Sequence, residues 1–287
     1  MVIFDGVSLI VVFALVIASI VDIRIREVPD VLSYCLFAFG IIHSLFLSAY
    51  FYDYMFFVSG IFGFLFALVF SLLFYYTGQW GGGDAKLLMA LGFLFGVDLF
   101  RLRFFDNFFI SFFISIFLVG ALWGLIWSFF LVFKNFKVFL RGYANFTKSS
   151  KLYSFKNWFL GAFVFFILIV FFLGLGLFFK VILWSLLLFC MLYFYLYFFS
   201  KVVEKYCMVK RIPVNSLVEG DWIVGKVKLK NGKFFSSSKT GLEKKDIFLL
   251  KKNVDFVDVR EGVPFVPSFL FAYLICLFFG AWLSLFF

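Results

Sequence analysis

The sequence has few of the residues that build metal sites and disulfide frameworks. Its four cysteines, Cys35, Cys190, Cys207 and Cys276, are scattered, and no two of them have Cys-x-x-Cys spacing. This pattern supports neither a zinc knuckle nor a set of disulfides. The one histidine, His43, lies in an apolar stretch without a second ligand nearby in sequence, so we interpret it as a packed or interfacial residue. We therefore expect no metal and no cofactor.

Charged residues are also scarce. They make up 15% of the chain, whereas 65% of the residues are hydrophobic and the mean hydropathy is +1.10. Soluble domains contain roughly 45–50% apolar residues, so this composition excludes a soluble globular domain. Several apolar runs reach the length of about 20 residues that a helix needs to cross a bilayer. The sequence predicts an all-α polytopic membrane bundle.

Hydropathy predicts eight membrane spans, of which the fourth is short, and seven is the alternative count. The expected spans cover residues 2–21, 31–50, 54–77, 84–98, 107–133, 157–176, 181–200 and 263–287. We expect a catalytic membrane core of about five spans over residues 1–133, two further spans within 157–200 and a C-terminal span over 263–287.

Basic residues divide unequally between the two sides of this bundle. With eight spans, one side receives 23 of the 26 Lys and Arg residues, and the other side holds only Arg101, Arg103 and Lys180. Without the long segment 201–262 the division is still 9 to 3. Cytoplasmic loops carry the excess of Lys and Arg, so the first side is predicted to face the cytoplasm and both chain ends to lie outside. No basic residue precedes the first apolar run, which favours a retained span over a cleaved signal.

This topology also explains the net charge of +10. The charge indicates attraction to anionic lipid headgroups and no nucleic-acid binding. Residues 134–156 carry six basic residues and no acid, and we interpret them as a basic cytoplasmic loop that contacts lipid. Docking of an acidic partner protein is the alternative interpretation.

Residues 201–262 are rich in charge and glycine, unlike the apolar spans. Asn231-Gly232 lies between alternating runs and predicts a β-hairpin. Residues 242–253 have helical spacing, and residues 256–259 read as a short strand. We expect a small cytoplasmic α+β domain over 201–262. A domain of about 60 residues is only marginally stable alone, so we expect it to pack against the membrane-spanning part of the chain.

Two carboxylates stand at span ends, where a charge is costly and marks a candidate functional site. Asp22 closes the first span, and Asp84 opens the fourth span directly after Gly81, Gly82 and Gly83. On the predicted topology both acids lie at the cytoplasmic face. That placement is compatible with a pair that is already assembled and with one that closes when substrate binds.

A pair of carboxyl groups suits peptide hydrolysis. One member takes a proton from water and the other polarises the carbonyl group, and a pair that shares a proton titrates as a unit, so we assign no fixed acid or base. The three glycines let the backbone approach a substrate and move.

Each of these residues also has an ordinary structural interpretation. Asp22 alone fits an interfacial acid paired with Arg24 or Arg26, and Asp84 fits a helix N-cap. Lys86 fits a side chain that extends to the headgroups. The combination of these residues at two span ends favours the catalytic interpretation.

The two motifs resemble those of the type IV prepilin peptidases, especially the archaeal prepilin and preflagellin peptidases, which are membrane aspartyl proteases of the Gly-x-Gly-Asp type. The first motif is matched by Asp22, Arg24, Arg26, Val28, Pro29 and Asp30, and the second by Gly81, Gly83, Asp84 and Lys86. The resemblance covers roughly residues 1–130. The stretch from Pro213 to Pro267 looks like the C-terminal extension of archaeal members.

The resemblance implies cleavage of the short basic leader of pilin-like or archaellin precursors on the cytoplasmic side, with Asp22 and Asp84 as the catalytic acids. From their charge, Glu27 and Asp30 are candidate contacts for Lys or Arg of the leader. Bacterial members often carry a Cys-x-x-Cys region and also methylate the new N-terminus. This chain lacks that region, so we expect peptidase activity without N-methyltransferase activity.

Two other classes compete with this interpretation. A protease of the presenilin or signal-peptide-peptidase type also uses Gly-x-Gly-Asp, but it has Tyr before its first Asp and a Pro-Ala-Leu motif, and here Val21 precedes Asp22 and no Pro-Ala-Leu occurs. A transporter, channel or structural subunit is the other class. The acids lie at one membrane face and not at mid-depth, which argues against transport.

Overall fold

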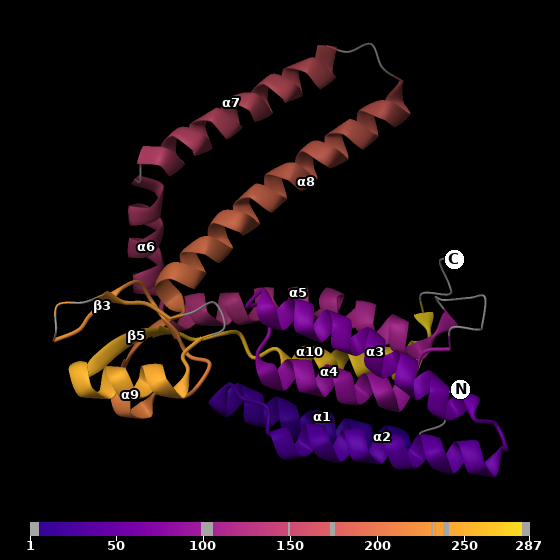
Figure 1. Cartoon of the computed structure of the whole chain (residues 1–287). Coiled ribbons are helices and arrows are strands. Elements are labelled where there is room, and N and C mark those ends of the chain that lie inside the picture. The colour runs from indigo at the N-terminus through magenta and orange to yellow at the C-terminus, as the bar shows by residue number, and fades with distance from the viewer. Residues whose placement is uncertain are drawn as a thin grey trace. The chain divides into compact units, whose positions relative to one another are not determined.

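The computed structural model describes residues 6–98, 106–148, 150–172, 176–230, 232, 234–237 and 241–282. The chain divides into two compact units (Figure 1). The first comprises Met1–Trp127 and Lys210–Phe287, and the second comprises Ser128–Val209.

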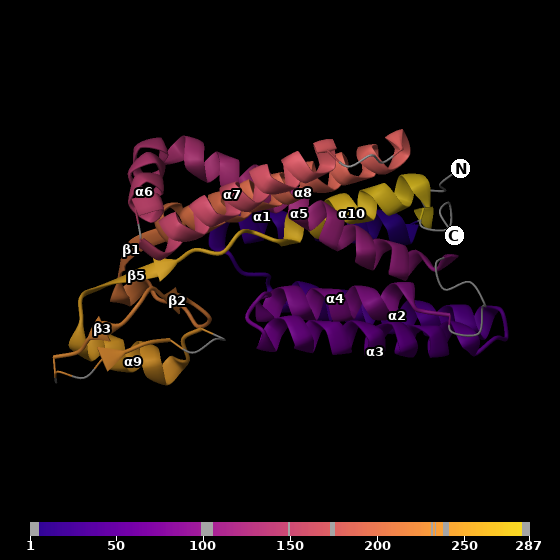
Figure 2. The same cartoon turned by 90° about the horizontal axis from the view of Figure 1, so that it is seen from above.

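The first unit is built on six helices, which lie side by side in Figures 1 and 2. They are α1 (Gly6–Ile25), α2 (Asp30–Tyr50), α3 (Met55–Tyr76), α4 (Gly82–Phe95), α5 (Phe108–Lys134, whose last residues belong to the second unit) and α10 (Val266–Phe279). Helix α4 packs against α2 and α3, and α1 packs against α10. One apolar core joins all six, with Leu15, Leu88, Phe112 and Phe269 fully buried in it.

Small residues let α3 and α4 approach closely. A Cβ atom at Gly63 of α3 would overlap the carbonyl oxygen of Gly92 in α4, and one at Gly92 would lie 2.7 Å from the Cβ of Ala67. Further along α3, the Ser71 hydroxyl donates a hydrogen bond of 3.1 Å to the carbonyl oxygen of Ala85. Close packing of small residues is what stabilises helix pairs in lipid, where apolar surface alone gives no preference for a neighbour. This contact fixes α4, and Asp84 with it, against the bundle.

The first unit also contains the strand region. Its elements are β1 (Val209–Pro213, whose first residue falls in the second unit), the short helix η3 (Val214–Ser216), β2 (Trp222–Ile223), β3 (Val227–Lys228), β4 (Phe234–Phe235), α9 (Lys244–Asn253) and β5 (Phe256–Arg260). The strands form a sheet of order β1-β5-β2 and the hairpin β3-β4. Leu250 of α9 is fully buried against Val257 and Val259 of β5.

The local predictions for this region agree with the structure. The hairpin pairs Val227 with Phe235 and Lys228 with Phe234, and the expected helix and last strand are present as α9 and β5. Asn231 of the predicted turn lies outside the described residues, as do Arg101 and Arg103.

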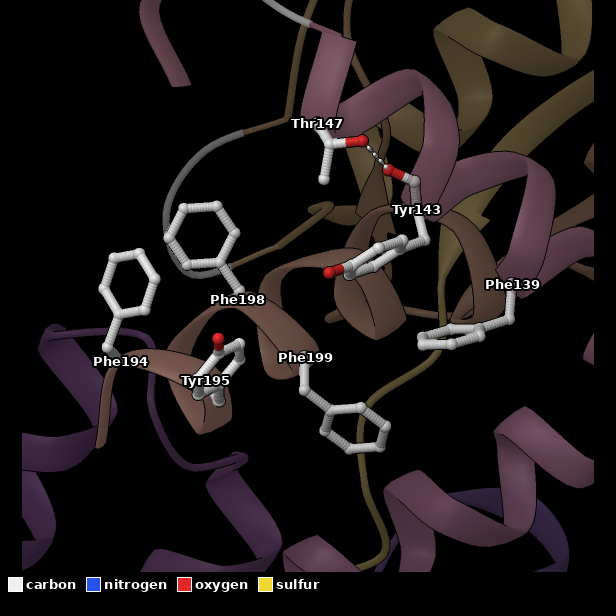
Figure 3. Close-up of a pocket in the computed structure, with 7 residues that line it drawn as sticks. All are labelled: Phe139, Tyr143, Thr147, Phe194, Tyr195, Phe198 and Phe199. Atoms are coloured by element: carbon white, nitrogen blue, oxygen red, sulfur yellow. Dashed lines mark hydrogen bonds between the residues drawn. The ribbon is translucent and has the colours of Figure 1, made fainter. Parts of the chain in front are cut away.

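The second unit holds α6 (Phe136–Lys148), α7 (Ser150–Phe172), α8 (Leu177–Val202) and the π-helical turn η2 (Val203–Cys207). A cavity of about 220 Å³ lies between α6 and α8 (Figure 3). It is lined by Phe139, Tyr143, Thr147, Phe194, Tyr195, Phe198 and Phe199. This lining contains no carboxylate, so the cavity is not the place where the two acids act.

Residues 134–156, interpreted from the sequence as a basic cytoplasmic connection between spans, contain regular secondary structure. Its described residues include α6 and the first turns of α7. Lys137, Arg141 and Lys148 recur at helical spacing and share one face of α6, while Phe139 and Phe146 lie on the opposite face. The basic residues therefore form one side of an amphipathic helix.

Five helices in the described part of the chain are long and apolar enough to cross a membrane. They are Gly6–Ile25, Asp30–Tyr50, Met55–Tyr76, Phe108–Lys134 and Leu177–Cys207. The other three expected spans correspond to the 14-residue helix α4, the apolar part Asn157–Phe171 of α7 and the 14-residue helix α10. The chain is thus a multi-pass membrane protein, and the count of eight spans stays a prediction.

Candidate functional site

Asp22 is held by two different parts of the chain. It lies in the last turn of α1 and is only 5% exposed. Its carboxylate accepts a hydrogen bond of 2.9 Å from the backbone N–H of Val266, the first residue of α10, and the neighbouring Phe265 N–H acts on it as well. Among the alternatives for Asp22, Arg24 is exposed and Arg26 acts on it electrostatically. The main partner of Asp22 is therefore a helix N-terminus that lies 244 residues away in sequence.

Arg26 turns the chain and places a cation near Asp22. Its φ of 60° lies in the left-handed region, which is uncommon for a residue other than glycine. The guanidinium lies over the ring of Trp127 in α5, at 4.8 Å from its centroid, and interacts with the charges of Asp22 and Glu261. Its Nη1 atom is buried and has no hydrogen-bond partner among the described residues. The stacking on Trp127 thus fixes the position of a guanidinium group whose hydrogen-bond donors are only partly paired.

Asp84 is the third residue of α4, two residues inside the helix start. Its carboxylate accepts a hydrogen bond of 3.2 Å from the backbone N–H of Gly81, the residue at the N-cap position. The N-cap of α4 is therefore Gly81 and not Asp84, which accepts the N-cap N–H from the third position of the helix. The charge of Asp22 acts on the Asp84 carboxyl. The structure thus brings the acids of α1 and α4 within range of a direct electrostatic interaction.

Only one of the two motif glycines is required by packing. A Cβ atom at Gly83 would lie 2.8 Å from the Cβ and 3.1 Å from the backbone nitrogen of Val28. A Cβ atom at Gly81 would meet only the Asp84 side chain, at 3.5 Å. Real Cβ atoms do not approach other atoms as closely as the first case requires. Gly83 therefore lets the chain that follows Asp22 lie directly against the start of α4.

Lys86 and Asp30 join the two motifs. Asp30 is the first residue of α2, and its carboxylate lies 2.6 Å from the Lys86 ammonium. The ammonium also lies 5.7 Å from the centre of the Tyr34 ring. Both side chains of the pair are partly exposed, at 37% and 54%. An exposed ion pair contributes about 0–1 kcal/mol to stability, so its value here is the alignment of α2 with α4. The pairing occupies Asp30 and leaves the exposed Glu27 as the freer of the two acids that were candidates for leader binding.

The remaining motif residue shapes the link between α1 and α2. Pro29 stands at the N-cap of α2 with a φ of −60°, the value that the proline ring imposes. Within the described ranges no group of three or more His, Cys, Asp or Glu side chains is arranged to hold a metal ion.

Sequence reasoning missed two contributors to the site. Trp80 directly precedes the glycine run, is 6% exposed and packs against Phe117, Phe265 and Phe269. A large aromatic residue before three glycines was an available signal. The second contributor is the start of α10 with its hydrogen bond to Asp22, for which the pair of prolines at 264 and 267 was an available signal of a helix start.

The comparison with known proteins agrees with this geometry. Residues 9–125 match the type IV leader peptidase family. The chain is 35% identical over 80 residues to the preflagellin peptidase of Methanococcus maripaludis and 36% identical over 80 residues to that of Methanocaldococcus jannaschii. Each alignment covers 28% of this chain and 34% of the relative, so the chain spans about a third of the length of the curated relatives it matches. Both acids, the three glycines and Lys86 lie inside residues 9–125, the part of the chain that is similar to the type IV leader peptidase family.

Proposed function

We propose that this protein is a membrane aspartyl endopeptidase that removes the short basic leader of prepilin-like or preflagellin precursors at the cytoplasmic face of the membrane. The observation that supports the proposal is the electrostatic interaction between the carboxyl groups of Asp22 and Asp84. They come from helices far apart in sequence and interact electrostatically where Gly83 packs on Val28. The family match and the two preflagellin peptidases support the substrate class.

The reaction follows from two carboxyl groups that share a proton. The ionised member takes a proton from a water molecule while the water oxygen bonds to the scissile carbonyl carbon, and the protonated member donates a hydrogen bond to the carbonyl oxygen. Collapse of this intermediate breaks the C–N bond, and the departing amine takes a proton from the pair. No group outside the protein and water is needed.

The test of this function is the processing of added precursors by membranes that contain the protein. Membranes that contain the protein are combined with a panel of preflagellin and prepilin-like precursors, and mass spectrometry reads the mass of each product. We expect loss of the leader just before the hydrophobic segment and a new N-terminus that carries a free amine. Precursors that all stay intact would sink the peptidase proposal, and a methylated N-terminus would contradict the expected absence of N-methyltransferase activity.

Glu27 is the exposed acid beside the site and has the opposite charge to a basic leader. We expect Glu27→Lys to raise KM for a precursor with a basic leader by roughly 3–10-fold, about the effect of one exposed charge pair, and to leave kcat within twofold. A precursor whose leader charges are changed to Gln serves as the control. An equal change in KM for both precursors would remove Glu27 from leader recognition.

The Lys86–Asp30 pair gives a prediction about alignment. Asp30→Lys alone places two ammonium groups side by side and should lower kcat by about tenfold, since it separates the start of α2 from the start of α4. The exchanged pair, Asp30→Lys with Lys86→Asp, restores opposite charges, so we expect it to recover most of that loss. Initial rates of precursor cleavage at matched protein levels measure both variants. A double variant no better than Asp30→Lys would show that the pairing itself has no role.

A further inference from the structure

Asp22 stands at an unfavourable place on its own helix. It lies in the last turn of α1, where the free carbonyl groups make the helix end negative, and it is buried. A buried carboxylate is costly unless it is paired or hydrogen-bonded. The element that meets this need is α10, because its positive N-terminal end faces the carboxylate through the Val266 N–H at 2.9 Å.

The start of α10 is shaped for this contact. Pro264 and Pro267 have no N–H group, and between them lie Phe265 and Val266, the two residues whose backbone N–H groups act on Asp22. Val266 is fully buried and is the first residue of the helix, so its N–H has no partner within α10. The Asp22 carboxylate thus accepts a hydrogen bond from the Val266 N–H, and the Phe265 N–H acts on it as well, in a turn bounded by two prolines.

Other contacts fix this turn in the first unit. The Trp123 indole N–H donates a hydrogen bond of 2.7 Å to the carbonyl oxygen of Pro264. The Phe265 ring lies where a side chain at Gly120 would be, since a Cβ atom there would be 2.6 Å from it. The same ring lies 5.4 Å from the ring of Trp80, which precedes the glycine run of Asp84. The turn therefore contacts the supports of both acids.

We propose that the N-terminus of α10, through the Val266 N–H, is a positioning element of the active site that orients the Asp22 carboxylate and stabilises its negative charge. This inference rests on the proposed function, and it assigns a role to a segment outside the matched residues 9–125. The other charged groups that act at this point are Arg26 from α1 and Asp84 from α4, with Glu261 acting on Arg26. The active site then needs three helices, α1, α4 and α10.

The kinetic test removes the donor atom and keeps the side-chain position apolar. Val266→Pro deletes the N–H, and Val266→Ala shortens the side chain but keeps the N–H. For Val266→Pro we expect kcat for a processed precursor to fall by about tenfold or more, the effect of losing one hydrogen bond to a charged group, with KM within twofold. The acid limb of its pH–rate profile should move to higher pH, because the carboxylate loses a group that stabilised its charged form. Val266→Ala keeps the N–H, so its pH–rate profile should stay that of the wild type. Its kcat is free to fall, because the shorter side chain leaves a cavity.

A second measurement reads the geometry without activity. Cysteines at positions 22 and 266, in a full-length chain whose native cysteines are replaced by serine, should join through a short thiol cross-linker. The pair at positions 22 and 271 is the control, since Phe271 is 44% exposed on the same helix, and it should stay unlinked.

The outcomes separate the two proposals. Failure of the 22–266 pair to link, or a Val266→Pro variant with wild-type kcat and pH profile, would overturn the role of α10. A wild-type protein that cuts no precursor overturns the proposed function instead, and with it the positioning role of α10 in that reaction. The cross-link still decides whether α10 lies against residue 22.

Discussion

Asp22→Asn and Asp84→Asn are each expected to reduce leader cleavage by roughly 10²–10⁴-fold, the range that general acid–base groups contribute. Asparagine keeps the size of the side chain and can still accept the hydrogen bonds from Val266 and Gly81, so the fold should persist. It cannot carry the proton that the reaction transfers. The measurement is the rate of precursor processing at matched amounts of membrane-inserted protein.

Asp53→Asn is the matched control for this experiment. Asp53 also accepts a hydrogen bond at a helix start, from the Met55 N–H at 2.9 Å, but it is exposed. It lies at the N-terminal end of α3, whereas the site residue Asp84 follows the C-terminal end of that helix. We expect it to process precursors at the wild-type rate. Undiminished processing by both Asp22→Asn and Asp84→Asn would make the two acids structural and would favour the transporter or scaffold interpretation. Loss in only one of them would exclude a shared pair.

The apolar elements could be predicted from the sequence because lipid imposes one simple rule on them. A long apolar run marks a helix regardless of its neighbours, and α1, α2, α3, α5 and α8 agree with the predicted spans to within a few residues at most ends. Segment 134–156 was different, since its basic residues suggested a loop. The spacing of Lys137, Arg141 and Lys148 indicates a helix, but the total charge of the segment was considered and this spacing was not.

The candidate site could be predicted only where its signals were local. Asp84 follows its glycines directly, and Asp22 ends an apolar run, so both acids could be named from the sequence. The partner of Asp22 is a backbone N–H at Val266, and the prolines that flank it indicate a helix start but not the residue which that helix contacts. The pairing of Lys86 with Asp30 likewise joins residues on different helices, and either one alone fits a surface charge.

From the sequence alone, the glycines of the second motif cannot be distinguished. In the structure their surroundings differ, so substituting them should change precursor cleavage by different amounts. We expect Gly83→Ala to lower precursor cleavage by about 100-fold, because the new Cβ must push Val28 away and a shift of about 1 Å at a reacting group costs roughly that much. Gly82→Ala is the matched control in the same helical turn. Its Cβ would meet only the Tyr75 ring, at 3.8 Å, which is an ordinary contact, so its cleavage rate should stay within a few-fold of the wild type.

A compensating change separates this steric effect from a need for glycine flexibility. In the double variant Gly83→Ala with Val28→Gly, the Cβ at position 28 is gone, and only the backbone nitrogen remains at 3.1 Å from the new methyl group. If the loss is caused by the collision, the double variant should recover at least about tenfold of it, as expected when two neighbouring residues share one packing defect. If the loss is caused by a stiffer hinge before Asp84, Val28→Gly should recover nothing, and Gly82→Ala should be as inactive as Gly83→Ala. Precursor cleavage rates of the four proteins, with wild type as the reference, therefore decide whether the first motif positions Asp84 by direct contact.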